Sequence, residues 1–188
     1  MSLTSVKDFV SYISTTGVTR DNHFDFVMAG ISTGLTTELA LAGITPTSGI
    51  QALNMMAKNV SLPGVTFSTA TRNDNSMPRR IAYDKSFGEL DITFICGADM
   101  AEKNFFDCWK NYIFKSNKTV EYYDNYVVDS TIYISSSAGD GFETDYFITV
   151  KEMYPVTVTP LVLDRSSENQ VLTFQVSFAF RDVLENWI

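Results

Sequence analysis

The chain has 188 residues, of which 45% are apolar and 13% aromatic, and its formal net charge is −8. This is a globular composition, and the length is enough for a single domain, residues 1–188, with a substantial core. The negative charge disfavours ordinary binding to phosphate backbones and acidic membrane surfaces. There is no signal-peptide pattern, no apolar run near the roughly 18 residues of a membrane span, and only two cysteines. We therefore expect a reduced, cytosolic protein without membrane insertion.

The first half of the chain is predicted to contain a helix, two strands and two irregular segments. Residues 3–15 suit a short amphipathic helix, and apolar–polar alternation predicts a half-buried strand over 24–28. Residues 30–50 are rich in Gly, Ser and Thr and are expected to form a long connection, with a small hairpin or helix inside. Residues 51–60 are expected to be a strand, and the polar stretch 69–80 an exposed, mobile loop.

A strand followed by a helix is predicted between residues 90 and 114. Alternate positions from Leu90 to Cys96 place apolar side chains on one face of the strand. Asp99 is expected to be the N-cap of the helix, with Glu102 completing a capping box. An apolar stripe at helical spacing then follows: Phe105, Trp109, Tyr112 and Ile113.

The C-terminal third is predicted to be mostly strand. Residues 117–125 are expected to form a short edge strand, and 131–135 and 144–151 a hairpin that the Tyr154-Pro155 dipeptide ends. Residues 171–180 show the clearest period of two. Their apolar positions are Leu172, Phe174, Val176, Phe178 and Phe180, and Thr173, Gln175 and Ser177 face the other way.

The fold class is therefore mainly β: an antiparallel β-sandwich or barrel of about seven or eight strands. One α-helix, at about 100–114, packs on it, and a short helix precedes it at the N-terminus.

Sites for catalysis or metal binding are not expected. The single histidine, His23, suits a solvated turn, and Cys96 and Cys108 have neither zinc-site spacing nor the other ligands. Both cysteines are expected to be small buried hydrophobes, with a reactive thiol as the alternative. Glu143 and Asp145 share a strand face that is expected to be solvated. We expect no enzyme, no metal and no cofactor.

Four segments, taken in order, resemble the tail tube proteins of contractile-tailed, T4-like bacteriophages: GVTRDNHFDFVM (17–28), AKNVSLPG (57–64), RRIAYDKSFGELDITFICGADMAEKNFFDCWKNYI (79–113) and EMYPVTVTPLVLDRSSENQVLTFQVSFAF (152–180). Order and spacing carry the resemblance, which covers about two thirds of the chain. The longer connection at 30–50 and the N-terminal helix depart from the family pattern. They leave room for the related tube initiator, and type VI secretion tube proteins are a further relative.

The resemblance implies a self-assembling virion structural protein. Its hexameric rings would close a continuous inner β-barrel and stack into the tail tube, with the helix at 100–114 bracing the outside of the sheet. The implied partners are other copies, the tail sheath protein, the baseplate or tube initiator, the tail terminator, and genomic DNA that passes through the bore during ejection without specific binding. The protein would be part of the virion tail and would assemble in the host cytoplasm.

Two sets of residues are candidates for assembly roles. Arg72, Asp74, Arg79 and Arg80 are candidates for inter-subunit or ring-stacking contacts, although a plain solvated loop explains them without the resemblance. Thr173, Gln175 and Ser177 are candidates for lining the lumen, in competition with ordinary solvent exposure.

Three functional hypotheses remain open on the sequence. The first is the tail tube subunit, with the tube initiator or a baseplate tube-like protein as its close variant. The second is a monomeric β-barrel module that binds a small apolar ligand, which the high Phe content suits. The third is a hydrolase that uses His23, Asp25 and a distant Ser.

Overall fold

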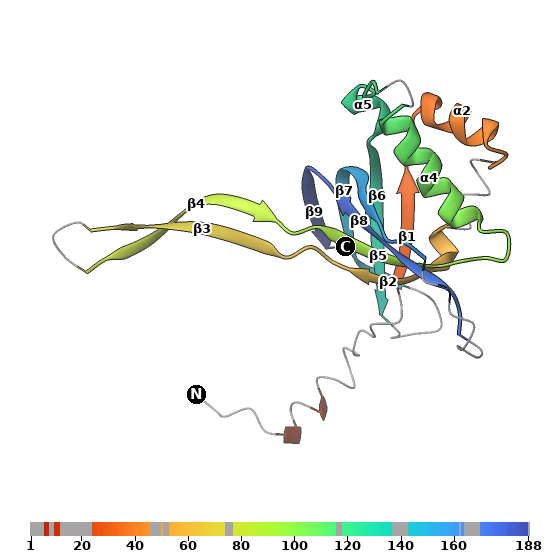
Figure 1. Ribbon diagram of the computed structural model, residues 1–188. Coiled ribbons are helices and arrows are strands. Elements are labelled where there is room, and N and C mark those ends of the chain that lie inside the picture. The colour runs from red at the N-terminus through yellow and green to blue at the C-terminus, as the bar shows by residue number, and fades with distance from the viewer. Residues whose placement is uncertain are drawn as a thin grey trace.

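Antiparallel strands dominate the computed structural model (Figure 1). It describes residues 6–7, 10–11, 24–45, 50, 53–73, 77–115, 118–136, 143–161, 163 and 170–187. The strands are β1 (Phe24–Ala29), β2 (Ala57–Ser61), β3 (Val65–Arg72), β4 (Arg79–Phe87), β5 (Leu90–Ile95), β6 (Val128–Ser136), β7 (Glu143–Val158), β8 (Thr173–Ala179) and β9 (Asp182–Trp187). The helices are α2 (Thr33–Leu41), α4 (Ala101–Ile113) and α5 (Tyr123–Tyr126). This confirms the mainly β fold class.

The long strand β7 joins two sheets. Residues 146–150 of β7 pair with both β6 and β9, and residues 154–158 pair with β8. The hydrogen-bonded order is β1-β6-β7-β8-β5-β2, with β9 attached to β7. One sheet is therefore β1-β6-β7-β9, and the other is β2-β5-β8 together with the C-terminal part of β7.

The bend in β7 lies at Glu152, which has a φ of 54°. The Asp129 carboxylate holds it, because it accepts hydrogen bonds from Lys151 Nζ (2.6 Å) and from the Glu152 N–H (3.0 Å). The Tyr154-Pro155 dipeptide was predicted to end the strand, and this was wrong. The register shifts between Pro155 and Thr157. Proline has no N–H to donate to a strand ladder, and it is tolerated at such an irregularity because the regular hydrogen bonding is interrupted there.

Aromatic rings fill the space between the sheets and α4. The ring of Phe94 in β5 lies 6.3 Å from that of Phe26 in β1 and 5.7 Å from that of Phe174 in β8. The ring of Phe106 in α4 lies 5.0 Å from Phe94, and the indole N–H of Trp109 donates to the Tyr126 carbonyl at 2.9 Å. The predicted stripe of α4 thus faces the core, where Phe105, Trp109 and Tyr112 are buried.

The start of α4 differs from the predicted capping box. The N-cap is Met100, whose φ is 56° and whose side chain makes no capping hydrogen bond. Glu102 is buried and reaches past the cap to accept the Gly97 N–H at 2.9 Å. Asp99 Oδ1 accepts the Ala101 N–H at 3.4 Å. The two acidic residues thus accept hydrogen bonds from backbone N–H groups around the start of the helix. These N–H groups, of Gly97 and Ala101, are not the ones that a capping box would satisfy.

Other boundaries also correct the sequence prediction. The segment 30–50 contains α2, whose N-cap Ser32 accepts the Leu35 N–H at 3.3 Å. The strand predicted over 51–60 begins only at Ala57, because residues 53–56 are helical. The described part of the segment 117–125, residues 118–125, is no edge strand, since it holds a single bridge from Val120 to Phe114 and the start of α5. The strand β9 was not predicted. Of the N-terminal helix, only residues 6–7 and 10–11 are described, and these are helical.

Candidate assembly surfaces

A two-stranded arm projects from the body of the subunit (Figure 1). It consists of β3 and β4, which pair from Val65 opposite Phe87 to Arg72 opposite Arg79. The stretch 69–80 was predicted to be a loop, and this was wrong, because only residues 73–78 connect the strands. The predicted exposure holds, since almost every residue of both strands is exposed. We call this element, residues 65–87, the arm.

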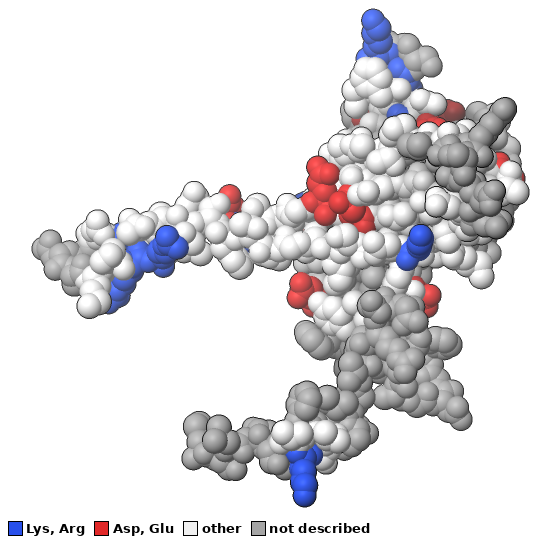
Figure 2. Space-filling view, turned by 60° about the horizontal axis from the view of Figure 1, so that its bottom comes forward, with Lys and Arg blue, Asp and Glu red and all other residues white. Residues whose placement is uncertain are grey.

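The far end of the arm is positively charged. Arg72 and Arg79 lie opposite each other on one face, and Arg80 lies opposite Thr71 on the other face. All three arginines are exposed, and Figure 2 shows Lys and Arg side chains gathered toward this end. The fourth predicted residue, Asp74, lies outside the described residues. The structure thus brings the three arginines together at the end of a ribbon, and we call this end the tip.

The near end of the arm forms a groove with β9. The groove has a volume of about 370 Å³ and is lined by Val65, Phe67, Lys85, Phe87, Val183 and Glu185. Lys85 Nζ lies 4.5 Å from the centroid of the Phe87 ring. Exposed acidic residues surround the groove: Glu89, Asp182 and Glu185. Figure 2 shows Asp and Glu side chains gathered on the body where the arm begins. We call this region the root.

The second sheet has a polar outer face. Thr173, Gln175 and Ser177 of β8 are half-buried on it, and Phe174, Val176 and Phe178 are buried on the opposite face. This confirms the predicted alternation of this strand. The neighbouring strands continue the face with mostly polar partners in register: Asp91 and Thr93 of β5, Asn59 and Ser61 of β2, and Thr157 of β7. The apolar exception is Ile95 of β5, which lies opposite Thr173.

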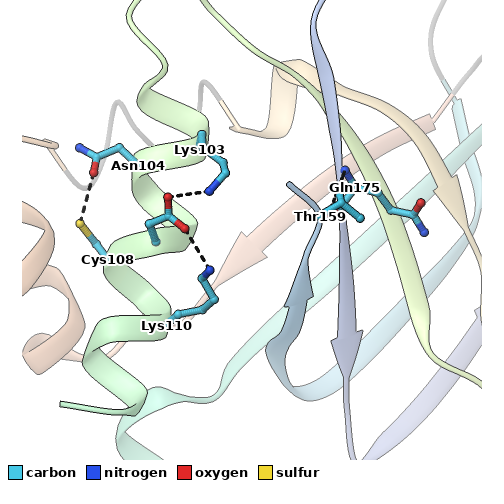
Figure 3. A network of polar contacts seen from close by, with 7 residues as sticks. Lys103, Asn104, Cys108, Lys110, Thr159 and Gln175 are labelled. Atoms are coloured by element: carbon cyan, nitrogen blue, oxygen red, sulfur yellow. Dashed lines mark hydrogen bonds and ion pairs between the residues drawn. The ribbon is translucent and has the colours of Figure 1, made fainter. Parts of the chain in front are cut away.

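Hydrogen bonds tie this polar face together. Ser177 Oγ donates to Asp91 Oδ1 at 2.5 Å. The Gln175 N–H donates to Thr159 Oγ1 at 2.8 Å, and that hydroxyl donates back to the Gln175 carbonyl at 3.0 Å (Figure 3). These bonds hold the side chains of Ser177, Asp91 and Thr159 in place on the strand surface. The polar residues named for this face are three in β8 and five in the neighbouring strands. Among these eight, Asp91 alone carries a charge.

Two edges of this sheet are open among the described strands. β2 pairs with β5 on one side only, and residues 154–158 of β7 pair with β8 on one side only. Val156 on the latter edge is 49% exposed although it is apolar. Open edges carry unpaired backbone donors and acceptors, which makes them templates for pairing with another chain.

The outward side of α4 carries a small ion-pair cluster. Lys103 and Lys110 both reach the Asp107 carboxylate, at 2.6 and 3.0 Å, from neighbouring turns (Figure 3). Partial burial raises the pKa of Asp107, but the two hydrogen bonds from the lysines outweigh it and hold this pKa below its ordinary value. The cluster therefore lies on the side of the helix opposite the aromatic stripe that covers the sheets.

The residues considered for chemistry do not assemble into a reactive centre in the described part of the chain. Cys96 and Cys108 are free and half-buried against the core, so the prediction of small buried hydrophobes is confirmed in part. Burial, followed by nearby carboxylates, raises the pKa of both thiols, which keeps them protonated and poorly nucleophilic. His23 lies outside the described residues, as do the side chains of Glu143 and Asp145.

The described residues offer neither a cluster of metal ligands nor a membrane-spanning helix. They contain no cluster of three His, Cys, Asp or Glu side chains that is arranged to hold a metal ion. No described helix has the length and apolarity that a bilayer crossing requires.

Comparisons with known proteins agree with this architecture. The family model described as "Phage tail tube protein" matches residues 19–186. Curated protein sequences give no match. Among solved structures, a chain of the PVC sheath-tube complex, from an extracellular contractile injection system in the extended state, is similar with a TM-score of 0.65 at 16% identity. The alignment covers 99% of this chain and 100% of that one.

Two chains from the anti-feeding prophage are similar to a comparable degree. One belongs to its baseplate, with a TM-score of 0.60, 12% identity, and coverage of 91% of this chain and 97% of that one. The other belongs to its tube-terminating cap, with a TM-score of 0.62, 14% identity, and coverage of 91% and 92%. At these identities the likeness shows the fold, and the family model, which spans nearly the whole chain, shows the family. The chain belongs to the phage tail tube protein family and is a structural tail tube subunit rather than an enzyme.

Proposed function

We propose that the chain, residues 1–188 acting as one domain, is the repeating subunit of the inner tube of a contractile tail, and that it assembles into hexameric rings. The observation that carries this is the pair of open edges on one sheet. The β2 edge of one copy pairs with residues 154–158 of β7 in the next copy, which extends the sheet across the boundary. Such a head-to-tail contact closes into a ring when the rotation between copies is right, and closure pairs both open edges of this sheet.

The polar face of this sheet lines the bore in our proposal. Thr173, Gln175 and Ser177 lie at its centre, flanked by Thr93 and the carboxylate of Asp91. DNA affinity rises with each phosphate that a cation neutralises, so a surface of hydroxyls, amides and carboxylates holds DNA weakly. Genomic DNA can then pass through the bore during ejection without specific binding.

The arm supplies the contact between rings in this proposal. Its strands are exposed on both faces and project well away from the body. Arg72, Arg79 and Arg80 stand at its tip and meet the neighbouring ring. Asp74 belongs to the same proposed contact by its place in the sequence.

The outer helices and the two ends of the tube meet the other tail components. The similar chains come from sheath-tube, baseplate and cap complexes, which favours a sheath protein around the tube, a baseplate or tube initiator at one end, and a terminator at the other. In the ring, α4 braces the outside of the sheet near the subunit boundary. We place the assembled protein in the virion tail and its assembly in the host cytoplasm.

Electron microscopy of the purified, concentrated protein without a template tests the proposal. Six-fold rings are expected, and they should stack without a length limit. Rings that do not stack would favour the tube initiator instead. Particles of single-subunit size at every concentration would contradict self-assembly and would favour a monomeric ligand-binding module.

One pair of matched variants tests the ring contact itself. Val156→Asp places a charge on the open edge of β7 and should abolish rings. Val120→Asp makes the same change at a valine that is 62% exposed after α4, away from the open edges, and should leave rings intact. Rings from Val156→Asp would contradict the proposed pairing.

A further inference from the structure

We propose that the tip of the arm of one copy docks into the root groove of a second copy. This inference rests on the proposed function, because it names the surface that receives the arm. The groove is the one between the arm and β9, lined by Val65, Phe67, Lys85, Phe87, Val183 and Glu185.

The charges of tip and root are complementary. The tip carries the guanidinium groups of Arg72, Arg79 and Arg80. The root carries the exposed carboxylates of Glu89, Asp182 and Glu185, which outnumber the ammonium group of Lys85 in the groove lining. Figure 2 shows the two signs separated along the molecule, with positive side chains toward the end of the arm and negative ones at its start. Complementary patches steer association and fix its register. The tip of one copy is therefore complementary in charge to the root of an identical copy.

One copy cannot make this contact with itself. The eight residues of β3, at the rise of an extended strand, span about 26 Å between root and tip. The strands of the arm pair in register along this length, so the ribbon cannot fold back on its own root. The partner of the tip must be the root of another copy.

Apolar surface at both ends supports the same pairing. Near the tip, Met77 is 85% exposed and Ile81 is 47% exposed; at the root, Phe67 is 58% exposed. The arginine stems of the tip can also lie over the Phe67 ring, because a guanidinium stacks well on an aromatic face. The groove is thus suited to a positively charged ribbon end with apolar side chains beside its charges.

The contact gives the stack a direction. Tip and root are different surfaces, so each added ring leaves a free copy of the same surface, and the contact propagates without closing. A finished tube then exposes arm tips at one end and root grooves at the other. The components that start and stop the tube consequently have to meet surfaces of opposite charge.

A charge-swap experiment tests the docking. Arg79→Glu with Arg80→Glu reverses the tip, and Asp182→Lys with Glu185→Lys reverses the root. Each pair should lower the number of stacked rings at least roughly tenfold, because like charges across an interface are strongly unfavourable, and the combined four-residue swap should restore stacking. Lys118→Glu and Glu38→Lys change exposed charges elsewhere and should have no effect. Stacking that survives both reversals, or that the swap does not restore, would overturn the inference.

Cross-linking separates this inference from the ring proposal. In a background with Cys96→Ala and Cys108→Ser, Met77→Cys protein is mixed with differently tagged Val65→Cys protein and oxidised. A mixed disulfide between the two tags is expected, at least roughly tenfold above the yield with Val120→Cys in place of Val65→Cys. Rings without this disulfide would overturn the docking alone. The disulfide without rings would support the docking and contradict the hexameric ring, and the absence of both would overturn both.

Discussion

Removing the Phe94 ring should be among the most destabilising single changes in the chain. The ring is 0% exposed and touches both sheets and the helix, with centroid distances of 6.3 Å to Phe26, 5.7 Å to Phe174 and 5.0 Å to Phe106. Phe94→Ala would leave a cavity walled by three other rings, which are held by separate elements and cannot collapse together. Substitutions of this kind cost about 3–5 kcal/mol, and the lost ring pairs place Phe94 at the upper end of that range.

Urea unfolding of the dilute subunit, followed by tryptophan fluorescence and by circular dichroism, measures this loss. Dilution matters because assembly would add a concentration-dependent term to the apparent stability. Phe67→Ala is the matched control: the same substitution at a ring that is 58% exposed on the arm should change the unfolding free energy by less than about 0.5 kcal/mol. A loss below about 1 kcal/mol for Phe94→Ala, or equal losses for both variants, would refute the packing argument.

Four further variants test the start of α4, the bend of β7 and the polar face. Glu102→Ala strands the Gly97 N–H and should lower the unfolding free energy in urea by about 1.5–3 kcal/mol, and Glu102→Gln, which keeps an acceptor, should lose less. Burial raises the pKa of Asp129, but hydrogen bonds from Lys151 and the Glu152 N–H outweigh it, so the folded pKa lies below 3.8. Its stabilisation is therefore present above pH 3.8 and is lost as the pH falls through the lowered pKa, and Asp129→Asn should flatten the acid limb of a stability–pH curve. Gln175→Lys should raise the affinity of rings for duplex DNA about tenfold or more at low salt in a gel-shift titration, with a steep salt dependence.

The parts of the fold that the sequence predicted are those with one buried face. β5 and β8 alternate because Phe94 and Phe174 must face the core while Thr93 and Gln175 do not. The aromatic stripe of α4 has helical spacing for the same reason. In each case burial of one side of an element imposes a period on the residues, and the period can be read without a structure.

The arm was missed because burial imposes no period on it. Both faces of β3 and β4 are exposed in the subunit, so alternation is confined to short stretches such as residues 65–68 and is lost over residues 69–72. The polar run around Arg72 and Arg79 then looks like a loop. The groove at the root was equally invisible, since it joins Phe67 to Val183, which are more than a hundred positions apart in the chain.

Long-range pairing explains the remaining errors. Pro155 usually marks the end of a strand, but the pairing of β7 with β8 resumes beyond it, and the bend that permits this depends on Asp129 in another strand. Among residues 182–185 of β9, Val183 is half-buried and the other three are exposed. The sequence of this short strand therefore shows little of the alternation that predicts a strand. Its strand conformation comes from pairing with β7, from Lys151 opposite Asp182 to Tyr146 opposite Trp187.

The arm gains little stability from folding within one subunit and gains more from contact with a neighbouring copy. An isolated two-stranded ribbon is marginally stable, and ordering each backbone residue costs about 1–2 kcal/mol, which the exposed faces of β3 and β4 do not offset within one subunit. A neighbouring copy that covers Phe67 and Met77 supplies the missing burial. Every added ring then carries the ordering cost of its own arms. The affinity of each stacking step should consequently be similar from the first step to the last, and this property follows from a ribbon that lacks a core of its own.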